Sequence, residues 1–174
     1  TPHSHHYAHA KMCIEHGKAV LCEKAFTMNA AQAKDLIAFA EEKKVLLTEA
    51  IWTRYMPSRK MIDDVVASGV IGKITSLSAN LGYVMADKER MKRPELAGGA
   101  LLDLSVYPIN FASMVFGDKI ERIEASCTKI ETGVDAQDSI TIYFQDGKVA
   151  FLYTTMVAQT DRLGVINGDK GYIE

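Results

Sequence analysis

With 174 residues, of which 48% are hydrophobic and 24% charged, the chain has an ordinary globular composition, enough for one large domain or two small ones. Its 20 basic and 22 acidic residues give a formal net charge of -2, which argues against nucleic acid or an anionic membrane as an electrostatic partner. No apolar run approaches the ~20 residues that a membrane span needs. We therefore expect no nucleic acid and no membrane among its partners.

The first fifty residues alternate helical and strand patterns. A weak helical pattern over 5–15 is followed by an apolar run at 20–22, typical of a short buried strand. A helix is predicted over 30–43, and a second apolar strand over 45–47. Short apolar strands joined by helices indicate a parallel sheet covered on both faces.

The helix over 30–43 carries the clearest local signals. Asn29 is predicted to be its N-cap, with Gln32 three residues later as in a capping box. The apolar spacing predicts that its buried stripe is made of Ala33, Leu36, Ile37 and Ala40.

The pattern of elements changes near residue 51, so we place a domain boundary at about Ala50. A helix is predicted next, with Met61, Ile62, Val65 and Val66 facing inward. From Ile120 onward the pattern has period two, with an Asp146-Gly147 hairpin turn. The predicted fold is α/β: a parallel sheet in residues 1–50, then an α+β domain with an open, largely antiparallel sheet in residues 51–174.

Two other features concern the whole chain. It begins with Thr1 and stops after Gly171–Glu174, which reads as the start of a strand, so we expect a fragment of a longer protein. The cysteines Cys13, Cys22 and Cys127 are odd in number and lie in apolar stretches, which favours inert, reduced thiols and a cytoplasmic location.

A charged pair, Glu23-Lys24, follows the first predicted strand. Ligands of parallel sheets bind at the carboxyl ends of the strands. A lysine there would reach a ribose hydroxyl or a substrate oxygen and favour its negative charge. Taken alone, a surface ion pair contributing ~0–1 kcal/mol explains these two residues better.

Asp103 and Tyr107 are four residues apart and would share one face of a helix. A phenol beside a carboxylate or an ammonium suits proton transfer to an alcohol. Pro108 disfavours helical geometry at Tyr107, so we expect a kink there. The simpler alternative, a capping Asp103 and a core Tyr107, is slightly favoured by these residues alone.

The only tryptophan, Trp52, lies close to Arg54 at the domain boundary. An aromatic ring and an arginine at an interdomain cleft suit a planar or anionic ligand, and an interdomain packing anchor explains them equally well. The N-terminal histidines include His6 and His9, which would share a helical face, but no carboxylate or thiol lies close by in sequence, so we predict no metal site.

Five segments in this order resemble one known family: "TPHSHH", "GKAVLCEKAF", "AIWTRYMPS", "GGALLDLSVYPINFASMVFG" and "ETGVD". The chain is similar, over essentially its whole length, to the glucose-fructose oxidoreductase/inositol dehydrogenase (Gfo/Idh/MocA) family. Within that family it resembles the branch of dimeric dihydrodiol dehydrogenases and D-xylose dehydrogenases.

The resemblance implies that residues 1–50 are the C-terminal portion of a Rossmann domain that binds NAD or NADP, and that residues 51–174 are a truncated domain for substrate binding and dimerisation. It implies a hydride transfer between nicotinamide and a hydroxyl carbon of a sugar or trans-diol, in a homodimer formed through the C-terminal sheet. The implied roles are catalytic for Lys24, Tyr107 and Asp103, and cofactor-binding for Pro2, His3, His6, Glu23, Lys24, Trp52 and Arg54.

The sequence departs from the family pattern in three places. Ala25 replaces the usual proline, and because a cis alanine bond costs ~2.5–4 kcal/mol, we expect a trans peptide or a local shift. Ser105 stands where the family often has glycine. The glycine-rich dinucleotide fingerprint is absent, which keeps open a second hypothesis, a non-catalytic binding or oligomerisation unit derived from this fold.

Overall fold

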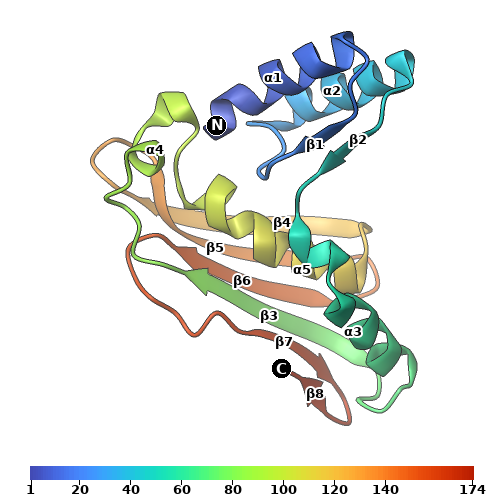
Figure 1. Cartoon of the computed structure of the whole chain (residues 1–174). Coiled ribbons are helices and arrows are strands. Elements are labelled where there is room, and N and C mark those ends of the chain that lie inside the picture. The colour runs from blue at the N-terminus through green and yellow to red at the C-terminus, as the bar shows by residue number, and fades with distance from the viewer.

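Two β-sheets organise the chain (Figure 1). The computed structural model describes all residues from 1 to 174. Near the N-terminus, β1 (Val20–Cys22) and β2 (Leu47–Glu49) form a two-stranded parallel sheet. The second sheet has six strands in the order β4-β5-β6-β3-β7-β8. The predicted α/β class, with a parallel sheet followed by a largely antiparallel one, is confirmed.

The first sheet packs against α1 (His3–Glu15) and α2 (Ala30–Lys43). Asn29 caps α2 as predicted, since its Oδ1 accepts a hydrogen bond from the Gln32 N–H at 3.0 Å. Gln32 Oε1 in turn accepts from the Met28 N–H at 3.2 Å. The shared apolar core of this part consists of Ala10, Ile14, Cys22, Leu36 and Ala40.

Two predictions about this part are wrong in detail. The second strand begins at Leu47 rather than at residue 45, because α2 ends in a left-handed Lys44 and the Val45 N–H still bonds to the Ala40 carbonyl at 3.0 Å. Ile37 is 47% exposed, although the spacing placed it in the buried stripe. The face of α2 that packs on the sheet is narrower than the stripe because Leu36 and Ala40 alone are fully covered.

The second part begins with the 3-10 helix η1 (Trp52–Tyr55) and with α3 (Pro57–Ala67). Neighbouring strands of its sheet run antiparallel, except that β3 pairs parallel with β6. Its strands are β3 (Ile74–Gly82), β4 (Ile120–Lys129), β5 (Asp135–Phe144), β6 (Val149–Thr155), β7 (Gly164–Gly168) and β8 (Tyr172–Ile173).

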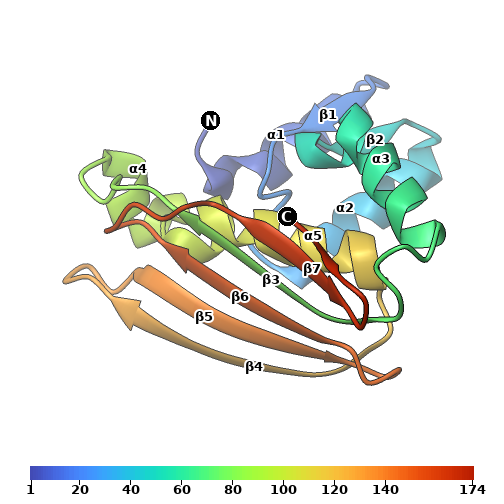
Figure 2. The same cartoon turned by 90° about the horizontal axis from the view of Figure 1, so that it is seen from below.

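Helical segments cover one face of the six-stranded sheet, and the opposite face carries none (Figure 2). They are α4 (Glu89–Lys92), η2 (Pro94–Leu96), the π-helix η3 (Leu101–Ser105) and α5 (Val106–Phe116). Apolar side chains of α5 pack on the sheet residues Leu77, Ile140, Ile142, Phe144 and Leu152. This packing fixes the height of α5, and with it Tyr107, above the sheet.

The stretch Pro94–Phe116 is long and apolar enough to cross a membrane by length and composition, with a mean hydropathy of 1.3 over its best window. Our expectation that no run approaches that length is therefore wrong. Core helices of globular proteins meet the same criterion, and α5 packs Ile109, Phe111, Val115 and Phe116 against the sheet. The stretch is weak evidence for a membrane span.

Other side chains predicted to be buried are exposed. Met61 and Val65 of α3 are 67% and 37% exposed, because α3 borders a groove instead of packing on the sheet. Cys127 is exposed on β4, whereas Cys22 is buried and its burial raises the pKa of its thiol to about 11.

Candidate active site

Lys24 lies just past the carboxyl end of β1, where a ligand of a parallel sheet would bind. Its Nζ donates hydrogen bonds to the backbone carbonyl of Asp103 at 2.8 Å and to Asp103 Oδ1 at 3.0 Å. A lysine ammonium has three N–H bonds, so one stays free for a further acceptor. The structure thus brings together Lys24 and Asp103, two of the three residues to which the family resemblance gave catalytic roles.

The segment after Lys24 differs from our expectation. The Lys24–Ala25 peptide bond is cis, so the predicted trans bond is wrong. The Ala25 carbonyl is held from α1, because it lies 2.7 Å from His6 Nδ1. The N–H of Phe26 donates to Glu49 Oε1 on β2 at 2.9 Å, which fixes the end of this segment.

Asp103 is the most heavily contacted carboxylate of the site, and its side chain is only 5% exposed. Arg90 binds it with both terminal nitrogens, at 2.7 Å to Oδ1 and 3.2 Å to Oδ2, and His3 Nε2 lies 3.4 Å from Oδ1. Burial by itself raises the pKa of Asp103, but hydrogen bonds from His3 and Arg90 and the charge of Lys24 outweigh it and hold that pKa far below its usual range. Asp103 is therefore a fixed anion.

Tyr107 lies four residues further on, near the start of α5. The Trp52 Nε1–H donates to its hydroxyl at 3.1 Å, and Lys24 Nζ is 5.3 Å from the centre of its ring. The π-helix η3 runs directly into α5, one residue before Tyr107. Pro108, which has no N–H to donate, lies where the π-helical turn gives way to the α-helix.

Buried polar residues hold η3 against the sheet. Ser105 Oγ donates to Asp138 Oδ2 at 3.0 Å and shares a hydrogen bond with Thr154, which itself bonds to Asp138 at 3.2 Å. Burial raises the pKa of Asp138, as does the neighbouring charge of Asp135. The serine that departs from the family pattern thus ties the turn between Asp103 and Tyr107 to β5 and β6.

Two hollows lie beside these residues: Lys24 and Asp103 line one, and Tyr107 lines the other. The first, which we name the polar pocket, has a volume of about 210 Å³ and is lined by Thr1, Pro2, His3, His6, Glu23, Lys24, Arg90, Leu96 and Asp103. The second, the apolar groove, has a volume of about 540 Å³ and runs between α3, α5 and β7. Most of its lining is apolar and includes Met61, Ile62, Val65, Leu81, Phe111 and Leu163.

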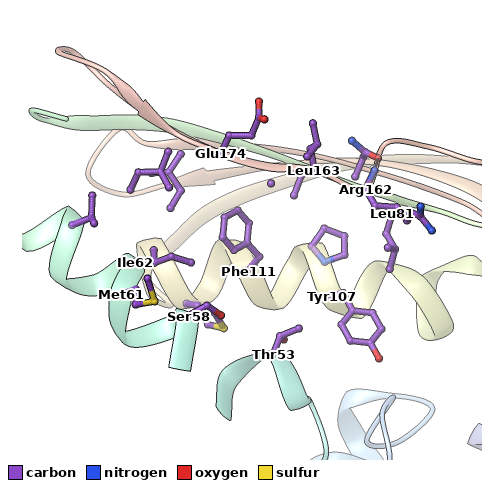
Figure 3. A pocket seen from close by; sticks show the side chains of 18 residues that line it. Thr53, Ser58, Met61, Ile62, Leu81, Tyr107, Phe111, Arg162, Leu163 and Glu174 are labelled. Atoms are coloured by element: carbon purple, nitrogen blue, oxygen red, sulfur yellow. Dashed lines mark hydrogen bonds between the residues drawn. The ribbon is translucent and has the colours of Figure 1, made fainter. Parts of the chain in front are cut away.

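Tyr107 lines the apolar groove. Figure 3 shows its ring beside the groove and its hydroxyl pointing away from the six-stranded sheet. Lys24, which lines the polar pocket, lies over the same ring. A substrate hydroxyl between these two side chains would meet both a phenol and an ammonium.

The predicted cofactor residues fall into two groups. Pro2, His3, His6, Glu23 and Lys24 all line the polar pocket. Trp52 instead contacts Tyr107, and Arg54 donates from Nε to Asn110 Oδ1 on α5 at 2.5 Å. Sequence reasoning missed Arg90, which lies in the short helix α4, within a charged stretch that has no periodic pattern.

The side chains of the polar pocket suit the nicotinamide end of a dinucleotide. Glu23 offers a carboxylate acceptor and Lys24 a free N–H donor, the two groups that ribose hydroxyls bind. His3 and His6 are buried there, with the His3 ring also 2.9 Å from the Ala97 carbonyl. No group of three or more histidine, cysteine or acidic side chains is placed to hold a metal ion.

Solved structures share this architecture. A 3-ketoreductase from Actinomadura kijaniata, crystallised with NADP and TDP-benzene, superposes with a TM-score of 0.93 at 28% identity, over 98% of this chain and 53% of that one. An aldose-aldose oxidoreductase from Caulobacter crescentus has a TM-score of 0.91 at 22% identity, over 99% of this chain and 53% of that one, a likeness of fold alone.

Curated relatives are closer in sequence. D-xylose 1-dehydrogenase (NADP(+)) of Hypocrea jecorina is 39% identical over 92% of this chain and 46% of its own length. Human trans-1,2-dihydrobenzene-1,2-diol dehydrogenase is 37% identical over 100% of this chain and 52% of its own. The chain spans about half the length of these relatives.

Family models match both parts of the chain. Residues 1–51 match the oxidoreductase family with an NAD-binding Rossmann fold, and residues 60–174 match the Gfo/Idh/MocA C-terminal domain. The chain therefore belongs to the Gfo/Idh/MocA family of oxidoreductases.

Proposed function

We propose that the chain is part of an NAD(P)-dependent oxidoreductase that transfers a hydride between nicotinamide and a hydroxyl carbon of a sugar or trans-diol. The observation that carries this proposal is that Lys24, which lines the polar pocket, lies with its Nζ 5.3 Å from the ring centre of Tyr107, which lines the apolar groove. The domain division that we propose has residues 1–50 on the cofactor side and residues 51–174 on the substrate side.

The cofactor, NAD or NADP, supplies the carbon that accepts or returns the hydride. In this proposal Pro2, His3, His6, Glu23 and Lys24 hold its nicotinamide end in the polar pocket. Trp52 and Arg54 position Tyr107 and α5 through the hydrogen bonds to Tyr107 and Asn110.

Residues of this chain accept the substrate proton and stabilise the charge that its transfer creates. During oxidation the substrate C–H bond breaks and its electron pair leaves with the hydride. The O–H bond breaks as its proton passes to the Tyr107 oxygen, and a carbonyl forms. Lys24 directs its one free N–H at the reacting oxygen and stabilises the negative charge that develops there. Asp103 fixes Lys24 through two hydrogen bonds and so acts as a positioning residue.

Substrate class and assembly rest on further observations. The relatives are named for D-xylose and for a dihydrobenzene diol, which suggests a small polyol or diol seated in the apolar groove. The helix-free face of the six-stranded sheet exposes Phe151 and Tyr153, which alternate along β6 with the buried Ala150 and Leu152, and a homodimer contact would cover these two rings. Three free cysteines fit a cytoplasmic protein.

The test is oxidation of D-xylose and of trans-dihydrobenzenediol by the purified protein with NAD and with NADP. Tyr107→Phe is expected to lower kcat about 10²–10⁴-fold, the range for a general acid–base group, and Lys24→Met to have a comparable effect. Tyr172→Phe and Lys60→Met alter exposed side chains and serve as controls. Wild-type kcat in both Tyr107→Phe and Lys24→Met would disprove this mechanism.

A further inference from the structure

Arg90 has no part in the proton transfer just described, yet it makes the shortest contact to Asp103. It belongs to α4, and its guanidinium holds both oxygens of the carboxylate, at 2.7 Å and 3.2 Å. The Arg90 side chain is 42% exposed, whereas that of Asp103 is 5% exposed. Such a two-point contact fixes the plane of the carboxylate as well as its charge.

The charges of this cluster do not balance. The single negative charge of Asp103 is shared by the Lys24 ammonium and the Arg90 guanidinium, so these three groups together carry a net charge of +1. Without Arg90, the Lys24–Asp103 pair would be neutral. The Tyr107 ring lies beside this cluster, 5.3 Å from Lys24 Nζ.

The other charged or titratable groups around the cluster are few. Glu23 precedes Lys24, Glu49 faces it from β2, and His3 and His6 reach it from α1. His3 and His6 are buried within hydrogen-bonding distance of carbonyls, and the Glu23 carboxylate accepts a hydrogen bond from the Lys24 N–H. On the side of Tyr107, Arg54 bonds to Asn110 of the same helix, and Arg162 and Glu174 line the same groove. Among all these groups, Arg90 is the one that binds both oxygens of Asp103.

We propose that Arg90 is a positioning residue for the reaction: by compensating Asp103, it leaves the positive charge of Lys24 available to Tyr107 and so sets the pH at which Tyr107 accepts the substrate proton. A positive charge favours a phenolate over a phenol. This inference rests on the proposed function and adds Arg90, which lies more than sixty positions from Lys24 in the sequence, to Lys24, Asp103 and Tyr107.

The first test is the pH profile of kcat for alcohol oxidation in wild type, Arg90→Gln and Arg90→Lys. The loss of one positive charge from this cluster is expected to move the half-maximal pH upward by about half a unit to one unit. Below that midpoint, the rate at fixed pH falls about 3–10-fold. Arg90→Lys keeps the charge and is expected to recover most of the shift, which loss of a merely structural contact would not do.

Arg93→Gln is the matched control. Arg93 follows α4 and pairs with Glu89 and Glu95 instead of Asp103, so its removal changes the local charge equally without touching the cluster. We expect a wild-type midpoint for this variant. An unshifted midpoint in Arg90→Gln, or an equal shift in Arg90→Lys, would overturn the inference; Arg90→Met serves as a second neutral variant should Arg90→Gln fail to fold.

A second measurement does not depend on turnover. The ultraviolet absorbance of phenolate is titrated against pH, and the signal of Tyr107 is assigned by its loss in Tyr107→Phe. We expect this signal to appear at higher pH in Arg90→Gln than in wild type or Arg93→Gln. A shift in a protein with no dehydrogenase activity would support the role of Arg90 while refuting the proposed function. An unshifted signal in an active enzyme would refute the role of Arg90 while leaving the proposed function supported.

Discussion

Two buried aspartates flank the turn that carries the candidate site, and they have opposite surroundings. Asp103 is 3% exposed and Asp138 is 4% exposed. Asp103 faces Lys24, Arg90 and His3, whereas Asp138 faces the hydroxyls of Ser105 and Thr154 and the carboxylate of Asp135.

The pKa of the two carboxyls moves in opposite directions as a result. Burial disfavours the anion in both, and only Asp103 has cations that overcome it. Degree of burial is therefore a poor guide to what an aspartate does. Asp103 is kept as an anion next to Lys24, and Asp138 anchors η3 to the six-stranded sheet.

The largest expected effect is that of Asp103→Asn. The change removes the charge that pairs with Lys24 and Arg90 and leaves a buried ammonium without its counter-ion. Removing one partner of a buried pair costs about 3–5 kcal/mol of unfolding free energy, and the partial exposure of Arg90 places this case at the lower end. Urea unfolding measures the loss, and kcat is expected to fall with it. Asp63→Asn, in an exposed pair on α3, is the control.

The pH dependence of stability separates the two aspartates next. The pKa of Asp103 is lower in the folded than in the unfolded protein, so its stabilisation is present above the unfolded value of about 3.9 and is lost as pH falls below it. The pKa of Asp138 is raised, so its contribution is present at low pH and is lost as pH rises through the folded value. Between pH 3 and pH 7, the curve of unfolding free energy against pH is expected to rise less steeply in Asp103→Asn than in wild type, and more steeply in Asp138→Asn. Parallel curves for both variants would contradict the comparison.

The sequence predicts one side of this comparison better than the other. A strand end and a helical spacing are local signals that single out Lys24, Asp103 and Tyr107, but taken alone they favour a surface ion pair and a core tyrosine, and it is the family resemblance that implies catalytic roles. Asp138 and Arg90 give no such signal: Asp138 is one polar residue in an alternating strand, and its contact with Ser105 depends on how the strand and η3 are placed in space.

The same distinction explains the errors in the fold. Periodicity identified the apolar stripe of α3, but nothing in it tells whether Met61 faces a core or a groove. The alternation after Ile120 predicted the antiparallel strands, whereas the parallel pairing of β3 with β6 joins residues about seventy positions apart. Local patterns predict the elements, and long-range packing decides which surfaces they present.

A smaller effect is expected from Ser105→Ala, which tests the anchoring side. The alanine removes a buried hydroxyl that bonds to Asp138 and Thr154, and the cost is about 1–2 kcal/mol. Because η3 carries Asp103 and precedes Tyr107, we also expect kcat to fall more than KM changes. Ser126→Ala on the exposed strand β4 is the control and should stay within about 0.5 kcal/mol of wild type. An unchanged kcat would show that the turn keeps its shape without this anchor.

The smallest effect is that of Asp138→Asn at neutral pH. The amide keeps an oxygen that accepts the two hydroxyl bonds, and the change removes the repulsion by Asp135, so gain and loss nearly cancel. The unfolding free energy should change by about 1 kcal/mol or less, against about 3 kcal/mol for the same chemical change at Asp103. The comparison therefore requires that Asp103→Asn lowers the unfolding free energy more than Asp138→Asn does, although both substitutions keep the side-chain shape and both sites are equally buried. Equal losses would mean that burial, and not the surrounding cations, decides what each carboxylate contributes.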